Sequence, residues 1–216
     1  MKPMENDMFE VLLAHSVIPV VEIDDAKDAT GLAEALLAGD ISVIEVTMRT
    51  SAAAAAIERI ASTVPDILVG AGTVLTEEES LRARDAGARF GVAPGTNPTV
   101  IASFSAAGLP FLPGAITPTE IESAMSSGCR LLKFFPAGAA GGPAMIKALH
   151  GPFSHHGIRF CATGGVGEAN MAEYLALDAV WAVGGSWLAP RPMIADHAWD
   201  DITERARAAC FNVRQI

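Results

Sequence analysis

The feature that most constrains the fold is a regular alternation of short apolar runs with longer alanine-rich stretches. Eight runs rich in Val, Ile, Leu and Phe are typical of buried strands, at 17–22, 41–46, 67–71, 89–92, 110–113, 130–135, 158–162 and 180–184. The intervening spacing predicts helices over 26–38, 51–62, 77–86, 97–107, 118–127, 143–149, 167–176 and 194–209. Because the strand runs are continuously apolar, they fit a parallel sheet that is buried on both faces.

Eight strands that alternate with eight helices predict a (β/α)8 TIM barrel. Residues 4–15 are expected to form an extra helix before the first strand. The alternative arrangement for such a pattern is an open, doubly wound sheet. The chain has neither a linker nor a low-complexity tract, so residues 1–216 are expected to form a single domain.

Helix boundaries carry local signals that support this pattern. N-cap residues or first-turn prolines are expected where predicted helices begin, at Asp25, Thr76, Asn97 with Pro98, and Thr117 with Pro118. Glycines follow four predicted helix ends, in the position called C′, at Gly39, Gly87, Gly108 and Gly128.

Composition narrows the class of partner. Lys and Arg number 15 and Asp and Glu number 25, which gives a net charge of −10. Such a balance argues against nucleic acid or an anionic membrane as a partner, although a pocket can still attract a small anionic substrate. The uncharged stretch 90–119 contains five prolines and is therefore expected to form buried strands and loops and not a membrane span.

Cysteine usage and the N-terminus indicate the compartment. The chain has three cysteines, Cys129, Cys161 and Cys210, with no C-x-x-C pair. This excludes a disulfide framework and a cysteine zinc site, and it fits a reducing cytosol. The first residues are too acidic and too poor in apolar residues for a signal peptide, so a cytoplasmic location is expected.

In a barrel the active site lies at the carboxyl ends of the strands. The second predicted strand ends in Glu45-Val46-Thr47-Met48-Arg49. Because side chains alternate along a strand, Glu45 and Thr47 share one face. Glu45 is a candidate proton carrier, and the alternatives are a solvent-exposed carboxylate or an ion pair with Arg49.

Lys133 lies inside the apolar run Leu131-Leu132-Lys133-Phe134-Phe135. Lysine is almost never fully buried unless it is paired, so its amine must reach a polar cavity or a partner. A lysine that extends to solvent or forms a buried ion pair would be purely structural. Apolar walls such as Phe134 and Phe135 also favour the neutral amine, which can form a Schiff base with a carbonyl.

Two glycine pairs follow the last two predicted strands, in Thr163-Gly164-Gly165 and in Gly184-Gly185-Ser186. Paired glycines let backbone N–H groups approach an anion, and barrels often bind phosphate after strands seven and eight. A tight turn is the alternative interpretation. The sequence has no P-loop, no G-x-S-x-G and no metal-binding histidine motif, and His155 and His156 are expected on the surface.

Seven motifs together resemble those of the 2-keto-3-deoxy-6-phosphogluconate aldolases, many of which also cleave 4-hydroxy-2-oxoglutarate. They follow in order as EVTMRT at 45–50, GAGTV at 70–74, APGTNP at 93–98, PGAITPTE at 113–120, LLKFFPA at 131–137, TGGV at 163–166 and VGGSWL at 183–188. The resemblance extends from about residue 10 to about residue 190. It implies a class I, metal-free lyase without a cofactor, on a (β/α)8 barrel that is usually a homotrimer.

The resemblance also implies residue roles. Lys133 would form the Schiff base and Glu45 would be the general acid and base, while Arg49 and Thr73 would hold the substrate carboxylate. The pocket walls would include Pro94, Phe135 and Thr163, and the phosphate would lie on Gly164, Gly165, Gly185 and Ser186. Two departures from the family pattern stand next to these residues: Ala162 where proline is usual and Gly138 where glutamate is frequent.

The implied reaction cleaves 2-dehydro-3-deoxy-6-phosphogluconate, a phosphorylated keto acid, to pyruvate and glyceraldehyde 3-phosphate. Three alternatives remain open. They are a phosphate-binding isomerase or epimerase, a metal-dependent pyruvate aldolase and a non-catalytic phosphosugar sensor. The sequence does not decide between the phosphorylated substrate and 4-hydroxy-2-oxoglutarate, or between gluconate and galactonate stereochemistry.

Overall fold

The strands form a parallel barrel. The computed structural model describes residues 4–215. Its eight strands are β1 (Val17–Val21), β2 (Val43–Thr47), β3 (Leu68–Gly72), β4 (Gly91–Val92), β5 (Phe111–Leu112), β6 (Leu131–Phe134), β7 (Arg159–Thr163) and β8 (Val180–Gly185). They pair in the order β5-β4-β3-β2-β1-β8-β7-β6, and every pair is parallel.

Backbone hydrogen bonds between β5 and β6 complete the ring. The Lys133 N–H donates to the Pro113 carbonyl at 2.9 Å, and the Ala115 N–H donates to the Lys133 carbonyl at 2.9 Å. β5 and β6 stand at the two ends of the pairing order, so these bonds close the sheet into a ring, whereas an open sheet would leave both strands as edges. The predicted (β/α)8 TIM barrel is therefore confirmed, and the doubly wound alternative is excluded.

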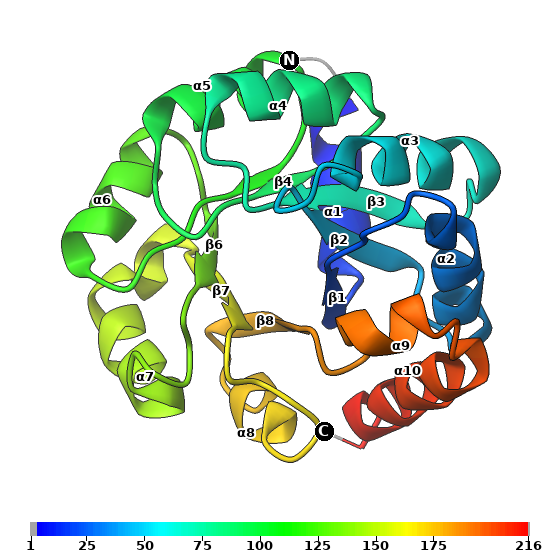
Figure 1. The fold of residues 1–216 in the computed structure, drawn as a ribbon. Helices are drawn as coiled ribbons and strands as arrows, with labels where there is room; N and C mark the ends of the chain where they lie inside the picture. The colour runs from blue at the N-terminus through cyan, green and yellow to red at the C-terminus, as the bar shows by residue number, and fades with distance from the viewer. Residues whose placement is uncertain (1–3, 216) are drawn as a thin grey trace.

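Most helices surround the barrel, and α1 (Met4–Leu13) lies behind its strands in the view of Figure 1. The other helices are α2 (Asp28–Ala38), α3 (Ala53–Thr63), α4 (Glu77–Asp85), α5 (Pro98–Ala106), α6 (Pro118–Ser126), α7 (Gly142–Phe153), α8 (Met171–Leu175), α9 (Arg191–Ala195) and α10 (Trp199–Val213), with a 3-10 turn at Ser154–His156. The prediction of a single helix over 194–209 is wrong. Two helices cover this part of the chain, and His197 between them has a left-handed φ of 53°.

The expected caps are mostly confirmed. Thr76 and Thr117 each form a capping box, and Asn97 accepts a hydrogen bond from the Thr99 N–H. Asp25 is not an N-cap, because α2 begins only at Asp28 and the Asp25 carboxylate instead accepts from the Lys27 N–H.

Gly39 is the exception among the expected helix ends. Gly87, Gly108 and Gly128 take the left-handed conformation just past their helices. After α2 it is Asp40, with φ 67°, that takes this conformation, while Gly39 has φ −96°. A Cβ atom at Gly39 would overlap Ala206 of α10, so the glycine there allows the close approach of two helices.

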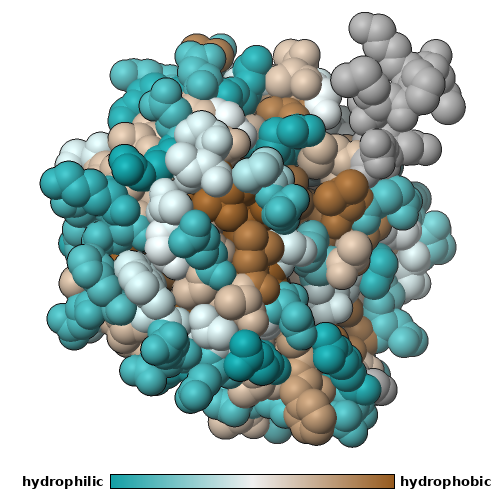
Figure 2. All heavy atoms as spheres, turned by 90° about the vertical axis from the view of Figure 1, so that its right-hand side faces the viewer, coloured by the Kyte–Doolittle hydropathy of each residue, from teal (hydrophilic) through white to brown (hydrophobic). Residues whose placement is uncertain are grey.

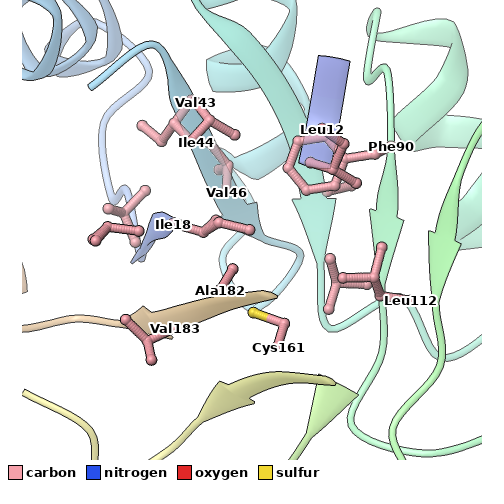
Figure 3. Packing of buried hydrophobic residues seen from close by; sticks show 14 of the residues in the cluster. Leu12, Ile18, Val43, Ile44, Val46, Phe90, Leu112, Cys161, Ala182 and Val183 are labelled. Atoms are coloured by element: carbon pink, nitrogen blue, oxygen red, sulfur yellow. The ribbon is translucent and has the colours of Figure 1, made fainter. Parts of the chain in front are cut away.

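The core lies inside the barrel and between the barrel and its helices. Figure 3 shows part of it, with Ile18, Val46, Leu112 and Ala182 from the strands and Leu12 from α1. The expected extra helix at the N-terminus is thus present, and its Leu12 is fully buried. On the face shown in Figure 2, hydrophilic side chains cover most of the surface around a small hydrophobic group. None of the helices in the described range 4–215 is long and apolar enough to cross a membrane.

Candidate active site

A buried ion pair spans the barrel interior. Glu45 is in the middle of β2 and Lys133 is in β6. Three strands separate β2 from β6 on each side of the ring, so the two strands lie opposite each other. The Lys133 Nζ lies 3.2 Å from the Glu45 Oε1, and the two residues are only 4% and 3% exposed. Glu45 is therefore neither in solvent nor paired with Arg49, which excludes both alternatives raised for it from the sequence.

The space for this pair is provided by small neighbours. A Cβ atom at Gly72 of β3 would overlap the Glu45 carboxylate, so only glycine fits there. The Lys133 Nζ also lies 5.3 Å from the centre of the Phe135 ring, which is within the range of a cation–π contact. The barrel interior thus holds one amine and one carboxylate, in contact and shielded from water.

Cys161 is a second buried nucleophile, and it is paired in register with Lys133 on the adjacent strand β7. Burial raises the pKa of its thiol to about 12, and the nearby Glu45 carboxylate adds to that rise. Because only the thiolate is strongly nucleophilic, Cys161 stays an inert thiol at neutral pH. Lys133 is therefore the better candidate nucleophile.

A cavity of about 310 Å³ opens above the ion pair at the carboxyl ends of the strands. The residues that line it come from β1, β2, β7 and β8, from the loops after these strands and after β6, and from the start of α9: Val20, Glu22, Thr47, Arg49, Phe135, Thr163, Gly164, Gly165, Val166, Gly185, Ser186, Ala189, Pro190 and Arg191. Thr47 and Phe135 come two residues after Glu45 and Lys133, so they share a strand face with the ion pair. The pair itself lies one layer below the lining.

Seven of the residues expected at the site line this cavity: Arg49, Phe135, Thr163, Gly164, Gly165, Gly185 and Ser186. Thr73 and Pro94 do not. Thr73, with a left-handed φ of 55°, directly follows Gly72, which faces the Glu45 carboxylate. Pro94 lies against Gly114, whose backbone bridges to Lys133. Each of the two residues is therefore next to a glycine that contacts the ion-pair residues, and neither lines the cavity.

The glycine loop after β7 is fixed by backbone and side-chain contacts. Gly164 and Gly165 have φ values of 90° and 76°, which explains why two glycines stand in succession. The Asn170 amide donates to the Gly165 carbonyl at 3.0 Å, and its oxygen accepts from the Gly167 N–H at 2.9 Å. Asn170 is a supporting residue that the sequence did not single out.

The two departures from the family pattern lie against this loop. The Gly138 N–H donates to the Gly164 carbonyl and the Ala137 N–H to the Thr163 carbonyl, each at 2.8 Å. Ala162 is fully buried in β7. The loop is thus held without the usual proline. The helix expected over 167–176 is shorter than predicted, since α8 begins only at Met171 and has five residues.

Charged residues at the cavity mouth were also missed by sequence reasoning. Glu22 follows β1 and accepts a hydrogen bond from Arg49 at 2.7 Å. Arg191, from the start of α9, lies 3.6 Å from the other Glu22 oxygen and forms two hydrogen bonds with Asp24. No motif marked Glu22 or Arg191, because only ring closure between β1 and β8 brings them together. Between residues 4 and 215, no group of three or more His, Cys, Asp or Glu side chains could hold a metal ion.

The chain is similar to known aldolases over almost its whole length. The family model for KDPG and KHG aldolase matches residues 8–205. A 2-dehydro-3-deoxy-phosphogluconate aldolase of Treponema pallidum is 46% identical over 91% of this chain and 92% of its own length. A KHG/KDPG aldolase of Escherichia coli is 40% identical over 97% of both chains.

A solved structure agrees with these relatives. The crystal structure of KDPG aldolase from Legionella pneumophila, with pyruvate captured as a covalent carbinolamine intermediate, matches this fold with a TM-score of 0.88. The two chains are 42% identical, and the match covers 96% of this chain and 98% of that one.

Proposed function

The chain belongs to the KDPG and KHG aldolase family, and from that membership we propose that Lys133 is its Schiff-base nucleophile and Glu45 the acid and base that serves it. The protein is a pyruvate-forming lyase. It cleaves 2-dehydro-3-deoxy-6-phosphogluconate to pyruvate and glyceraldehyde 3-phosphate, with cleavage of 4-hydroxy-2-oxoglutarate to pyruvate and glyoxylate as a second activity.

The observation that carries the residue assignment is the buried contact of 3.2 Å between Lys133 and Glu45. A lysine must be neutral to attack a carbonyl, and a carboxylate in contact with it can accept the proton directly. A phosphosugar sensor would need no such pair, because binding requires no reactive amine. An isomerase or epimerase would need a base but no lysine nucleophile.

Covalent capture comes first in the proposed reaction. Glu45 takes a proton from the Lys133 ammonium, and the neutral Nζ attacks the C2 ketone of the substrate to give a carbinolamine. Protonated Glu45 returns its proton to the C2 hydroxyl, which leaves as water. The product is an iminium between Nζ and C2, and it can accept the electron pair of the bond that breaks next.

Cleavage then follows from the same two residues. The Glu45 carboxylate takes the proton of the C4 hydroxyl, the C3–C4 bond breaks, and the aldehyde product leaves. The electron pair moves into the C2–C3 bond and yields an enamine on Lys133. Protonation at C3 and addition of water at C2 release pyruvate and restore the amine.

The cavity residues are proposed to place the two ends of the substrate. The planar guanidinium of Arg49 suits the carboxylate next to the ketone, with Thr73 assisting. Phe135, Thr163 and Pro94 shape the walls around the reacting carbons. The phosphate is assigned to backbone N–H groups of the two glycine loops and to the Ser186 hydroxyl, at Gly164, Gly165, Gly185 and Ser186.

Trapping with borohydride tests the nucleophile. Incubation with pyruvate and sodium borohydride is expected to inactivate the protein and to leave one reduced adduct, located by peptide mass spectrometry on Lys133. Lys27 and Lys147 are exposed and are internal controls. An adduct on either of them, or none at all, would contradict the assignment. Activity that EDTA removes and a divalent metal restores would favour the metal-dependent alternative.

Ser186→Ala tests the phosphate assignment. Hydrogen bonds to charged groups contribute about 1.5–3 kcal/mol, so kcat/KM for the phosphorylated substrate is expected to fall roughly 10- to 150-fold. The value for 4-hydroxy-2-oxoglutarate should hardly change, because that substrate has no phosphate. Steady-state kinetics with both substrates provide the measurement. Equal losses on both would place the phosphate elsewhere, and a wild type indifferent to phosphate would implicate the Ala162 departure.

We further propose that the protein acts as a cytoplasmic homotrimer of single-domain barrels. The resemblance to the family supports the trimer, and the odd number of cysteines supports the reducing compartment. Sedimentation equilibrium gives the mass of the assembly directly, and a monomer at micromolar concentration would refute the trimer.

A further inference from the structure

Three charged side chains meet at the mouth of the cavity, and one of them is a carboxylate between two arginines. The Glu22 Oε1 accepts from the Arg49 Nη1 at 2.7 Å, and its Oε2 lies 3.6 Å from the Arg191 Nη1. These three residues are the charged members of the cavity lining. Glu22 is largely shielded, with a quarter of its side chain exposed, whereas both arginines are more than half exposed.

Asp24 sets the orientation of Arg191. The Arg191 Nε donates to one Asp24 oxygen at 2.6 Å and Nη2 donates to the other at 2.5 Å, which leaves Nη1 directed at Glu22. These hydrogen bonds lower the pKa of Asp24, so it stays ionised at neutral pH. Arg191 belongs to α9, drawn in orange in Figure 1, between the barrel and α10. It is therefore a fixed second partner for Glu22.

Arg49 has two competing carboxylate partners, Glu22 and the substrate. Its proposed ligand is the carboxylate of the keto acid, yet its Nη1 already donates a hydrogen bond to Glu22. Two carboxylates close together repel each other, so a bound keto acid disfavours Glu22 in this position. The second arginine, 3.6 Å from Oε2, offers the displaced carboxylate a charged partner that needs only a small side-chain rotation.

We propose that Glu22 competes with the substrate carboxylate for Arg49 and passes to Arg191 when an α-keto acid binds. The proposal rests on the proposed role of Arg49. Glu22 and Arg191 are then positioning residues that act through Arg49 and set the affinity for any α-keto acid, whether or not it carries a phosphate. Glu22 weakens binding by occupying Arg49, and Arg191 strengthens it by drawing Glu22 away.

Pyruvate is the suitable probe, because it carries the keto acid carboxylate and nothing else. The measurement is the pyruvate concentration that gives half-maximal borohydride trapping on Lys133, in wild type, Glu22→Gln, Arg191→Gln and the double variant. Partly exposed ion pairs support effects of about 2- to 5-fold. We expect half-saturation at lower pyruvate in Glu22→Gln and at higher pyruvate in Arg191→Gln. The double variant should match Glu22→Gln alone, because without the Glu22 carboxylate there is no group that Arg191 can draw away from Arg49.

Arg214→Gln is the matched control. Arg214 is also exposed and forms an ion pair, at 3.1 Å from Asp40, but it does not line the cavity. Its half-saturation should equal that of wild type. Weaker pyruvate binding in Glu22→Gln would mean that Glu22 holds Arg49 in place for the substrate, and this would overturn the proposal. So would an Arg191→Gln effect that persists unchanged in the double variant, because Arg191 would then contact the ligand itself.

If the proposed roles of Lys133 or Arg49 are wrong, the trapping experiment gives different results. If Lys133 is not the nucleophile, the wild type gives no adduct there at any pyruvate concentration. If Arg49 does not bind the carboxylate, Arg49→Gln traps pyruvate at the wild-type concentration. Either result is visible without the Glu22 and Arg191 variants, so it cannot be confused with failure of the exchange.

Discussion

Replacing Lys133 with methionine is expected to lower kcat by roughly 10⁴- to 10⁶-fold, the scale on which removal of a covalent nucleophile acts in other enzymes. Methionine keeps an unbranched side chain of similar length and fills the space beside Phe135, but it has no amine to form an iminium. Both substrates pass through the same iminium, so cleavage of both should be lost together. Steady-state turnover of each gives the test.

Lys133→Met also leaves Glu45 as a buried charge without its partner. Removal of one member of a buried ion pair costs about 3–5 kcal/mol of folding stability, so loss of activity alone could reflect unfolding. The double variant Lys133→Met/Glu45→Gln removes both charges and is expected to unfold at a higher temperature than Lys133→Met. A folded double variant with turnover within tenfold of wild type would eliminate the covalent route.

The barrel could be predicted from the sequence because its signals are local and repeated. Each buried strand is a continuous apolar run, and Thr76 and Thr117 mark helix starts by capping boxes that need only four consecutive residues. The predictions failed where contacts between residues far apart in the sequence determine the local conformation. Gly39 is required by the approach of α10, whose Ala206 is far away in sequence, and not by a left-handed helix end.

The reactive pair could be anticipated from its two strands, but its geometry could not. A lysine inside an apolar run must have a polar partner, whatever the rest of the fold. Its partner Glu45 is 88 residues away, and only barrel closure shows that the two meet. Glu22 and Arg191 carried no comparable signal, because charged residues after a strand or before a short helix are ordinary surface residues until ring closure places them at one cavity.

Glu45→Gln is expected to lower kcat by about 10²- to 10⁴-fold, the usual contribution of general acid–base catalysis. Glutamine has nearly the same shape, so it fits the space left by Gly72, and it can still accept a hydrogen bond from Lys133 through its amide oxygen. It cannot take up the proton from the ammonium or from the C4 hydroxyl. Both steps depend on the same carboxylate, so neither substrate should escape the loss.

Trapping separates this role from that of Lys133. In Glu45→Gln the amine is still present, so borohydride and pyruvate should still label Lys133, but more slowly than in wild type. Glu58→Gln is the matched control, because Glu58 is exposed on α3 and its replacement should leave turnover unchanged. Near-normal turnover of Glu45→Gln would show that the buried carboxylate only neutralises the lysine. Slow labelling combined with slow turnover instead requires a group that moves protons, since a purely structural partner would leave the rate of iminium formation in the folded protein unchanged.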